Sequence, residues 1–367
     1  MPSGFIAVRV LLSGYYGFGN LGDEALLEVI VTQLRARFPS MQLDVLSATP
    51  EATAKEYGVE ATPRWSMRSV REAIGRADVV LSGGGGLLQT ATSARSIVYY
   101  AGILREAIRQ RRKSMIFAQS IGPLDLLGRI VVRSFCRGLD CATVRDARSL
   151  RLLQSLLPQT PMERTADPVF LYDLPVEDVD LSIEGLGHDP YAVVSVRKVT
   201  TLRDGQHAIA RAVDRLAITH DVRVAFLPMG GAADAEVSTT IIRLCKSAPM
   251  LLPECSLARA AAILRGARVV IGMRLHALIL AARFAVPFLA IPYDPKVTAL
   301  CDDLGYPLEP LWTPGRIAPS DPAVDALVDR LMSQRDELSA ALRDKVEEIR
   351  AAAARNFDVL GELLIDP

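Results

Sequence analysis

The sequence predicts an α/β protein with two Rossmann-like domains whose parallel sheets face each other across a cleft. Short apolar runs alternate with amphipathic segments of helical spacing, as expected for repeated βα units. The alternation stops near residue 175 and resumes at residue 191, so the chain contains two such blocks. Loops of small residues follow several apolar runs, at the sheet edge where α/β proteins bind ligands.

The first block, residues 1–175, is expected to form the N-terminal domain. Its strands are expected at Val8–Ser13, Leu43–Ser47, Val79–Ser82, Ser114–Ala118 and Leu139–Val144. Its helices are expected at Asp23–Phe38, Ser69–Arg76, Ile97–Arg109, Leu126–Arg137 and Asp146–Leu156. Asp23 is placed as the N-cap of the first helix.

The second block follows residues 176–190, which are rich in acids, prolines and glycines and are expected to be a linker. The C-terminal domain is expected over residues 191–320. Its strands are expected at Ala192–Val196, Val222–Leu227, Arg268–Ile271 and Phe288–Ile291. Its helices are expected at Gly205–Ala217, Ala232–Cys245, Leu257–Leu264 and Leu275–Phe284. Residues 321–367 are expected to form C-terminal helices that pack on either domain.

Composition and charge favour a cytoplasmic protein without a nucleic-acid partner. The formal net charge is zero, so no basic excess favours nucleic acid. Five scattered cysteines, an odd number, are typical of reduced thiols in the cytosol. The apolar N-terminus lacks a basic region and leads into a glycine loop, which predicts a first strand and no signal peptide. No apolar stretch reaches the roughly 18–20 residues of a membrane span.

Residues Gly17–Gly22 match the G-x-G-x-x-G pattern of dinucleotide-binding turns. Here Asp23 and Glu24 occupy the helix N-terminus, where they would repel a diphosphate. The acid expected at the end of the second strand is also missing, because Asp44 lies mid-strand. Two readings remain: a tight strand-to-helix turn, or a polar subsite in which Asn20, Asp23 and Glu24 bind sugar hydroxyls beside aromatic side chains.

Two further loops of small residues follow strands of the first block. Residues Gly83–Gly86 allow positive φ angles and close approach of the backbone to a ligand. Residues Gln119–Pro123 end another strand in the same way. A flexible loop is the simpler reading of a glycine run, but three such loops at one sheet edge favour ligand binding. The residues expected to contact the ligand are Gly84, Gly85, Gln89 and Ser120.

The corresponding loops of the second block carry cations. Ser195, Arg197 and Lys198 end its first strand, and an arginine fork beside a lysine suits a phosphate or carboxylate. A solvated strand end is the alternative reading. Gly230, in the loop Leu227–Gly231 after the next strand, is a further candidate for ligand binding.

Residues Gly272–His276 are the most informative segment of the chain. They join a buried strand to an apolar helix, so Arg274 and His276 lie at a helix N-terminus, where N–H groups and the helix dipole favour anions. The two side chains lie about 100° to either side of the buried stripe and share a ligand only if Arg274 is at or before the N-cap. A structural histidine is the alternative reading.

Seven motifs occur in an order that resembles one enzyme family. They are GYYGFGNLGDEALL, LSGGGGLLQ, AQSIGP, VRDARSL, ADPVF, SVRK and GMRLHALILA, within about the first 290 residues. The chain closely resembles the polysaccharide pyruvyltransferase family, in particular its bacterial CsaB-type enzymes. The resemblance implies a GT-B-like architecture of two Rossmann-like domains.

The resemblance implies a reaction as well as a fold. Phosphoenolpyruvate donates a pyruvyl group to two hydroxyls of one sugar, typically N-acetylmannosamine of a secondary cell-wall polysaccharide or its lipid-linked precursor. The products are a 4,6-linked pyruvate ketal and phosphate, and the charged ketal supports S-layer anchoring. The family implies peripheral contact with the inner face of the plasma membrane. We expect no metal and no cofactor other than the donor substrate.

The candidate residues fit this chemistry. Arg197, Lys198 and Arg274 supply the cations that the donor needs, so residues 191–320 are expected to form the phosphoenolpyruvate side and residues 1–175 the acceptor side. His276 is the candidate for proton transfer to the C3 carbon of phosphoenolpyruvate. Asp23 or Glu24 is expected to orient or deprotonate the acceptor.

Two other functions stay open. The first is a nucleotide-sugar-dependent GT-B glycosyltransferase, although the D-x-D pattern Asp178–Asp180 lies in the linker and no acid is identified for a ribose. The second is a non-catalytic sugar-binding regulator. A histidine among cationic and amide-rich loops disfavours the regulator.

Overall fold

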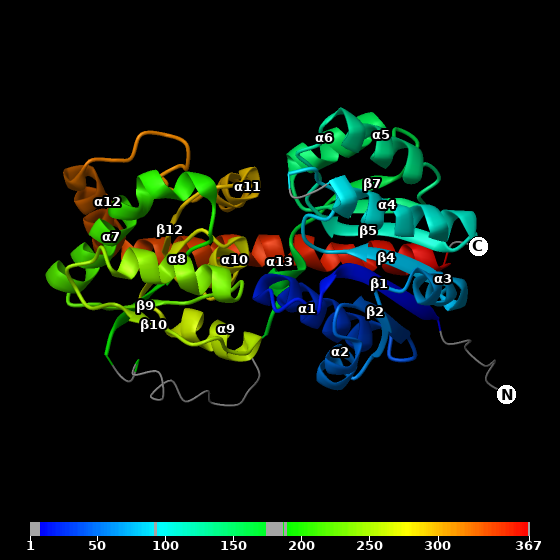
Figure 1. Cartoon of the computed structure of the whole chain (residues 1–367), viewed down its shortest axis with the longest axis horizontal. Helices are drawn as coiled ribbons and strands as arrows, with labels where there is room; N and C mark the ends of the chain where they lie inside the picture. The colour runs from blue at the N-terminus through cyan, green and yellow to red at the C-terminus, as the bar shows by residue number, and fades with distance from the viewer. Residues whose placement is uncertain (1–7, 92–93, 174–185, 187–188, 366–367) are drawn as a thin grey trace. The chain divides into compact units, whose positions relative to one another are not determined.

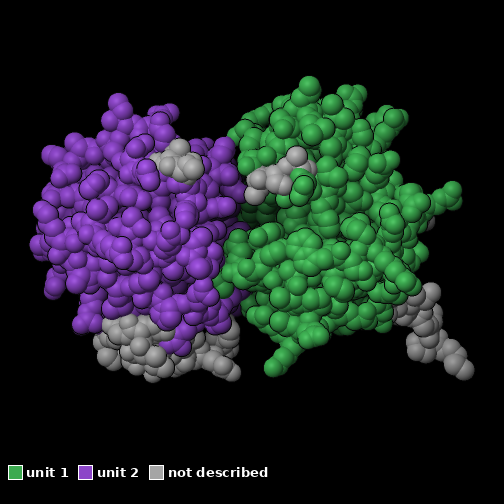
Figure 2. Space-filling view, viewed as in Figure 1, with its two compact units in different colours: residues 1–171, 349–367 green, residues 172–348 purple. Residues whose placement is uncertain are grey.

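The computed structural model describes residues 8–91, 94–173, 186 and 189–365, and it divides into two compact units. Unit 1 comprises Met1–Leu171 and Ile349–Pro367, and unit 2 comprises Tyr172–Glu348 (Figure 2). Most of the expected linker, residues 176–190, lies outside the described residues and stays a prediction. Each unit contains one parallel sheet covered by helices, as predicted for two Rossmann-like domains (Figure 1).

The sheet of unit 1 has seven parallel strands in the order β3-β2-β1-β4-β5-β6-β7. They are β1 Arg9–Tyr16, β2 Gln42–Ser47, β3 Glu60–Pro63, β4 Val79–Gly83, β5 Lys113–Gln119, β6 Cys141–Val144 and β7 Met162–Arg164. The strand order reverses between β1 and β4, and α/β sheets bind ligands outside the carboxyl ends of the strands at such a switch point. The glycine-rich loops at residues 17–20 and 84–91 follow these two strands, so they flank the switch point.

Helices cover both faces of this sheet. They are α1 Leu21–Arg37, α2 Pro50–Tyr57, α3 Met67–Arg76, α4 Ala94–Arg109, α5 Leu126–Phe135 and α6 Ala147–Leu156. On one face, α1 and the end of the last helix pack against strand residues such as Leu12 and Phe117. On the other face, α3 and α4 pack against Leu11 and Val80. Burial on both faces explains why the strands are nearly continuous apolar runs.

The sheet of unit 2 has five parallel strands in the order β10-β9-β8-β11-β12, with its switch point between β8 and β11. They are β8 Tyr191–Ser195, β9 Arg223–Phe226, β10 Met250–Leu251, β11 Val269–Gly272 and β12 Phe288–Ala290. The helices are α7 Gln206–Asp214, α8 Ala232–Ile242, α9 Leu257–Gly266, α10 Leu275–Arg283, α11 Pro295–Leu304 and α12 Asp321–Ser333. The expected helix over Gly205–Ala217 is α7 followed by a π-helical turn at Arg215–Thr219.

The last helix, α13 Arg335–Ile365, contributes to both units, since the division falls between Glu348 and Ile349. It is the longest helix, and its sequence is rich in charged residues. Among the described residues, no helix is long and apolar enough to cross a membrane.

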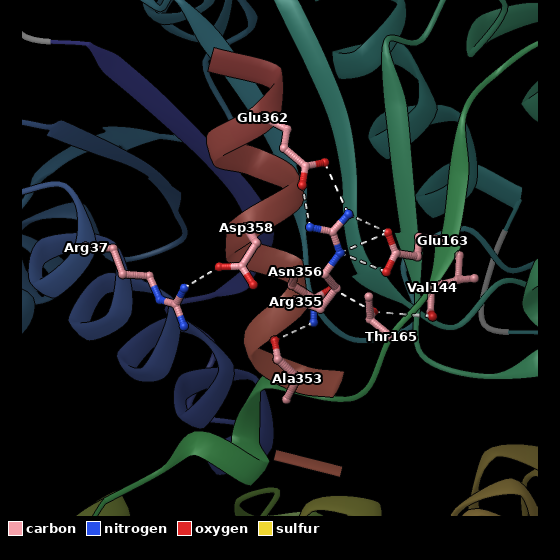
Figure 3. A network of polar contacts seen from close by, with 9 residues as sticks. All are labelled: Arg37, Val144, Glu163, Thr165, Ala353, Arg355, Asn356, Asp358 and Glu362. Atoms are coloured by element: carbon pink, nitrogen blue, oxygen red, sulfur yellow. Dashed lines mark hydrogen bonds and ion pairs between the residues drawn. The ribbon is translucent and has the colours of Figure 1, made fainter. Parts of the chain in front are cut away.

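A polar network fixes the end of α13 to the sheet of unit 1 (Figure 3). The Arg355 guanidinium donates to Glu163 of β7, with Nε 2.9 Å from Oε1. It also pairs with Glu362, seven residues further along α13. Asn356 is fully buried; its Oδ1 accepts from Thr165 Oγ1 at 2.7 Å. The contacts of Asn356 satisfy a buried amide, which makes this docking specific.

The N-cap predicted for the first helix is wrong. Asn20 is the N-cap, and its Oδ1 accepts a hydrogen bond from Gly22 N at 3.1 Å. Asparagine caps a helix as well as aspartate does, so the helix begins earlier than the apolar pattern suggests. Asp23 and Glu24 consequently lie in the first turn, where the helix dipole favours acids.

The sequence pattern did not predict five elements: α2, α11, β3, β7 and β10. The two helices carry ordinary signals, since each has proline in its first turn and ends at a left-handed glycine, Gly58 or Gly305. The three strands are two to four residues long at sheet edges, too short for a periodic pattern.

Candidate active site

The turn between β11 and α10 holds Arg274 against a buried carboxylate. Arg274 is the N-cap residue of α10, so the geometric condition for sharing a ligand with His276 is met. Its Nε donates to Asp234 Oδ2 at 2.7 Å, and its Nη2 donates to Asp234 Oδ1 at 2.6 Å. Asp234 lies in the first turn of α8 and is fully buried. This bidentate pair fixes the guanidinium at the sheet edge.

Gly230 allows this pair to form. A Cβ atom at Gly230 would lie 1.8 Å from Nη2 of Arg274 and 3.0 Å from Oδ2 of Asp234. A larger residue would therefore displace the guanidinium. Sequence analysis expected Gly230 to approach a ligand, and the structure places Arg274 against it instead.

Ser195, the last residue of β8, makes internal contacts. Its Oγ donates to the carbonyl of Leu227 at 3.1 Å, and its own carbonyl accepts from Met273 N at 2.8 Å. The side chain is fully buried. These bonds join the ends of β8, β9 and β11, which gives Ser195 a structural role at the switch point.

Arg197 and Lys198 follow the end of β8 and differ in their partners. Lys198 Nζ lies 2.7 Å from Glu236 Oε2 at the exposed surface. Arg197 Nη1 donates to the Tyr293 hydroxyl at 3.1 Å, and its guanidinium lies 5.4 Å from the centre of that ring. Burial lowers the pKa of Arg197, but Tyr293 and nearby aspartates raise it overall above its ordinary value. Arg197 thus stays charged while its hydrogen-bond partner is neutral.

His276 is the second residue of α10 and is half-buried. Its Nε2 atom is shielded from solvent. The first turn of α10 also presents backbone N–H groups that have no carbonyl partner within the helix. The turn after β11 therefore brings together the guanidinium of Arg274, an imidazole and helix N–H groups.

At the switch point of unit 1, Glu24 holds the loop after β1. Its Oε1 accepts from Gly17 N at 2.9 Å, and its Oε2 accepts from the Tyr57 hydroxyl at 3.2 Å. Burial raises the pKa of Glu24, although both hydrogen bonds lower it. A carboxylate of the chain thus uses the amide that a diphosphate would need, which argues against a dinucleotide at this loop.

Asp23 lies beside the glycine loop after β4. A Cβ atom at Gly85 would lie 3.1 Å from Asp23 Oδ1, and both Gly84 and Gly85 have positive φ angles, +69° and +74°. The Tyr16 hydroxyl donates to the carbonyl of Gly83 at 2.8 Å. The structure therefore brings the two glycine loops and Asp23 together at one switch point.

Three further predicted contacts have different surroundings. Asn20 caps α1, as described above. Ser120 Oγ accepts from Arg145 Nε at 2.7 Å, and Ser120 N donates to the carbonyl of Gly85 at 2.9 Å. Gln89 is half-buried farther along the loop after β4. Asn20 and Ser120 therefore support the loops of the site.

Sequence analysis missed Arg64, which follows β3 and is almost fully buried. Its guanidinium lies 4.8 to 5.4 Å from the centres of four rings: Phe18, Trp65, Tyr99 and Tyr100. Nη1 donates to the carbonyl of Gly14 at 2.7 Å, whereas Nε is buried with no hydrogen-bond partner among the described residues. Such cation–π contacts fix the rings around the charge.

Two of these rings, Phe18 and Trp65, form with Tyr15 a surface that we name the aromatic platform. Tyr15 stacks on Phe18 with ring centres 4.1 Å apart, and Phe18 meets Trp65 edge-on at 5.9 Å. Tyr15 is 40% exposed and Trp65 is 68% exposed. Arg64 and Trp65 follow a short edge strand, and the sequence there has no periodic apolar pattern. The sequence therefore did not predict the aromatic platform.

No metal-binding cluster is found among the described residues, and two buried cysteines are poor nucleophiles. No group of three or more His, Cys, Asp or Glu side chains there is arranged to hold a metal ion. The cysteines are all free, and burial raises the pKa of Cys136 and of Cys141 to about 12. Such thiols are poor nucleophiles at neutral pH.

The sequence profile of one family matches residues 20–295, well over half of the chain: polysaccharide pyruvyl transferase. The chain belongs to this family. The matched range contains every predicted site residue, from Asn20 to His276. No curated protein sequence matches this pyruvyl transferase family member significantly.

Solved structures resemble this family member in fold. A glycosyltransferase from Rickettsia africae has a TM-score of 0.65 at 8% identity, with 99% of this chain and 100% of that chain covered. The MnaA–UDP structure from S. aureus has a TM-score of 0.64 at 10% identity, covering 95% and 92%. An Anabaena protein in complex with UDP and glucose has a TM-score of 0.60 at 13% identity, covering 96% of each chain. The predicted GT-B-like fold class is confirmed.

Proposed function

We propose that this enzyme transfers the pyruvyl group of phosphoenolpyruvate to two hydroxyls of one sugar. The observation that carries the proposal is the cationic switch point of unit 2, in a chain of the polysaccharide pyruvyl transferase family. Phosphoenolpyruvate joins a phosphate to a carboxylate, so its site needs cations and N–H donors. Arg197, Arg274 and the N-terminus of α10 offer these groups.

The donor half of the reaction needs one proton at C3. His276 donates that proton, and C2 becomes an electrophile that the first sugar hydroxyl attacks. The second hydroxyl then forms its bond to C2 as the bond from C2 to the phosphate oxygen breaks. Of the two protons lost by the hydroxyls, one replaces the proton given to C3 and one leaves with phosphate. The sugar carries a pyruvate ketal at the end.

The acceptor half is assigned to unit 1. Asp23 is the proposed base for the sugar hydroxyl, because its carboxylate lies beside Gly85 in the glycine loop after β4. The aromatic platform suits the apolar face of a sugar ring.

The acceptor identity rests on the family. We propose N-acetylmannosamine of a secondary cell-wall polysaccharide or its lipid-linked precursor, a 4,6-linked ketal as product, and S-layer anchoring as the biological role. We also propose that the enzyme works in the cytoplasm, where phosphoenolpyruvate is made.

The test is a reconstituted reaction. Purified protein is incubated with phosphoenolpyruvate and a lipid-linked β-N-acetylmannosamine acceptor, phosphate release is followed, and the product is analysed by mass spectrometry for the ketal. 2-Phosphoglycerate, which lacks the enol, is the matched control donor. Acceptor-dependent phosphate release with ketal formation is expected. Transfer from a UDP-sugar with no response to phosphoenolpyruvate would establish the glycosyltransferase alternative.

A further inference from the structure

Exposed apolar side chains gather at the beginnings of three helices of unit 1. Leu126, Leu127 and Ile130 open α5 and are 77%, 53% and 53% exposed. Met67 opens α3 at 51% exposure, and Val98 in the first turns of α4 is 43% exposed. We name these five residues the apolar rim. Exposed apolar side chains that cluster on one face of a protein often mark an interaction site.

The three helices are neighbours in space. Helix α4 packs against both α3 and α5 on one face of the sheet, and Figure 1 shows the three together. A groove of about 950 Å³ is lined by residues of all three helices, among them Met67 of α3, Val98 of α4 and Phe135 of α5. Since each helix follows a parallel strand, all three first turns lie at the carboxyl edge of the sheet, as does the switch point.

These helices are also strongly basic, although the whole chain is neutral. Their cations are all arginines: Arg68, Arg71, Arg76, Arg95, Arg105, Arg109, Arg129 and Arg133. Their acids are Glu72 and Glu106, so eight positive and two negative charges leave a net charge of +6. Arg129 and Arg133, between and beside the apolar residues of α5, are exposed and form no ion pair with any described residue.

We propose that the apolar rim and the arginines of α3, α4 and α5 bind the surface of an anionic lipid bilayer. Exposed aliphatic side chains enter the interface between headgroups and acyl chains, and guanidinium groups pair with lipid phosphates in fork geometry. Neither signal alone gives stable attachment, but the two together do. The positive charge of this face complements anionic lipid headgroups, which disfavours a second copy of the same basic surface as the occupant.

Attachment through this surface does not depend on which reaction the enzyme performs. It has a functional consequence if the acceptor is lipid-linked, because the rim and the switch point of unit 1 share one edge of one sheet. The bilayer would then deliver the acceptor sugar to the edge that carries Asp23 and the aromatic platform.

The test is sedimentation of the full-length protein with vesicles. One set contains phosphatidylcholine alone, and the other contains equal parts of phosphatidylcholine and phosphatidylglycerol. The variants are Leu126→Gln/Leu127→Gln/Ile130→Gln, which removes the apolar rim of α5, and Arg129→Gln/Arg133→Gln, which removes its free charges. The matched controls are Ile317→Gln, at a residue 97% exposed in unit 2, and Arg243→Gln/Arg343→Gln, at exposed arginines of unit 2.

Wild type and both controls are expected to sediment with the anionic vesicles at low salt and to dissociate from them at high salt. The arginine variant should bind roughly 30-fold more weakly, at about 1 kcal/mol per basic residue. The rim variant should lose at least about 10-fold, from the aliphatic area that no longer leaves water. Circular dichroism and the phosphate-release assay with a water-soluble acceptor check that the variants fold.

Three results would overturn the proposal. One is wild-type protein that stays in the supernatant at low salt. Another is equal binding of wild type and both α5 variants. The third is a wild-type dimer in sedimentation velocity that becomes a monomer in the rim variant, since the apolar rim would then be an interface between two copies of the chain.

Discussion

The two switch points are built on the same scaffold and carry opposite charges. The order β10-β9-β8-β11-β12 in unit 2 repeats the order β3-β2-β1-β4-β5 in unit 1. In unit 1 a glycine turn with Asp23 follows the central strand, whereas in unit 2 Arg197 occupies the corresponding place. Three glycines, Gly84–Gly86, follow β4, whereas Arg274 and His276 follow β11. Strand order sets where a ligand binds, and the residues after the strands decide which ligand it is.

The charged residues of the two switch points fall into two groups. Some hold the protein's own loops, and others are proposed to contact a substrate. Glu24 in unit 1 and Asp234 in unit 2 each bind a neighbouring loop or guanidinium with both carboxylate oxygens. Arg197 donates to the Tyr293 hydroxyl and forms no ion pair with a described residue, which leaves its charge available to an anion. Within each unit, the comparison predicts that substitution of a supporting residue affects folding and substitution of an acting residue affects chemistry.

The largest expected effect is at His276. His276→Gln keeps a hydrogen-bonding side chain but cannot carry a proton at neutral pH, so kcat should fall by about 10²–10⁴ while the fold is kept. Steady-state kinetics with varied phosphoenolpyruvate measure this change, and thermal unfolding is the control. A variant with nearly normal kcat would show that the imidazole only positions the donor.

Asp23 and Glu24 provide a matched pair of acids on adjacent positions. Asp23→Asn should lower kcat by about 10²–10⁴ if the carboxylate deprotonates the sugar hydroxyl. Glu24→Gln should lower it far less, because an amide can still accept the hydrogen bond from Gly17 N. Equal losses in the two variants, or a larger loss for Glu24→Gln, would contradict the assignment of the base.

Arg274 is expected to affect stability as well as donor binding. Arg274→Ala leaves the buried Asp234 carboxylate without its partner, which should lower the free energy of unfolding by about 3–5 kcal/mol. Urea denaturation measures this loss. The double variant Asp234→Ala/Arg274→Ala should recover part of the stability, since it removes the unpaired charge. No recovery would mean that the cost arises from lost packing.

The smallest expected effect is a pH dependence at Glu24. Burial raises the folded-state pKa of Glu24 above the ordinary value of 4.5, so the protonated form is favoured in the folded protein. Its contribution to stability is full below about pH 4.5 and is lost as pH rises through the raised pKa. Glu24→Gln should therefore gain stability relative to wild type as pH rises through this window. Unfolding curves at several pH values test this, and a difference that does not change with pH would contradict it.

The sequence predicted the parts of the fold that depend on periodicity. Covered strands such as β4 and amphipathic helices such as α4 have repeating apolar patterns, and both were predicted close to their observed bounds. Short edge strands were missed because two to four residues carry no period. The π-helical turn after α7 and the N-cap of α1 depend on local hydrogen bonds that the pattern does not encode.

The sequence predicted where the candidate site lies better than it predicted what each residue does there. Small residues and charges after strands marked both sheet edges, because parallel strands end together. The sequence could not show that Asp234, forty residues before Arg274, pairs with it, since that contact depends on the fold bringing the first turn of α8 to the turn after β11. It also could not show Arg64 among four aromatic rings, because the rings come from three separate segments.

Calorimetric titration of phosphoenolpyruvate into three proteins tests the division of labour most directly: wild type, Arg197→Ala and Asp23→Asn. The donor should bind wild type and Asp23→Asn with similar affinity. Binding to Arg197→Ala should be about 10- to 150-fold weaker, the effect of losing 1.5–3 kcal/mol from one charge-assisted contact. Unchanged binding to Arg197→Ala, or loss of binding in Asp23→Asn, would contradict the assignment of the donor to the switch point of unit 2.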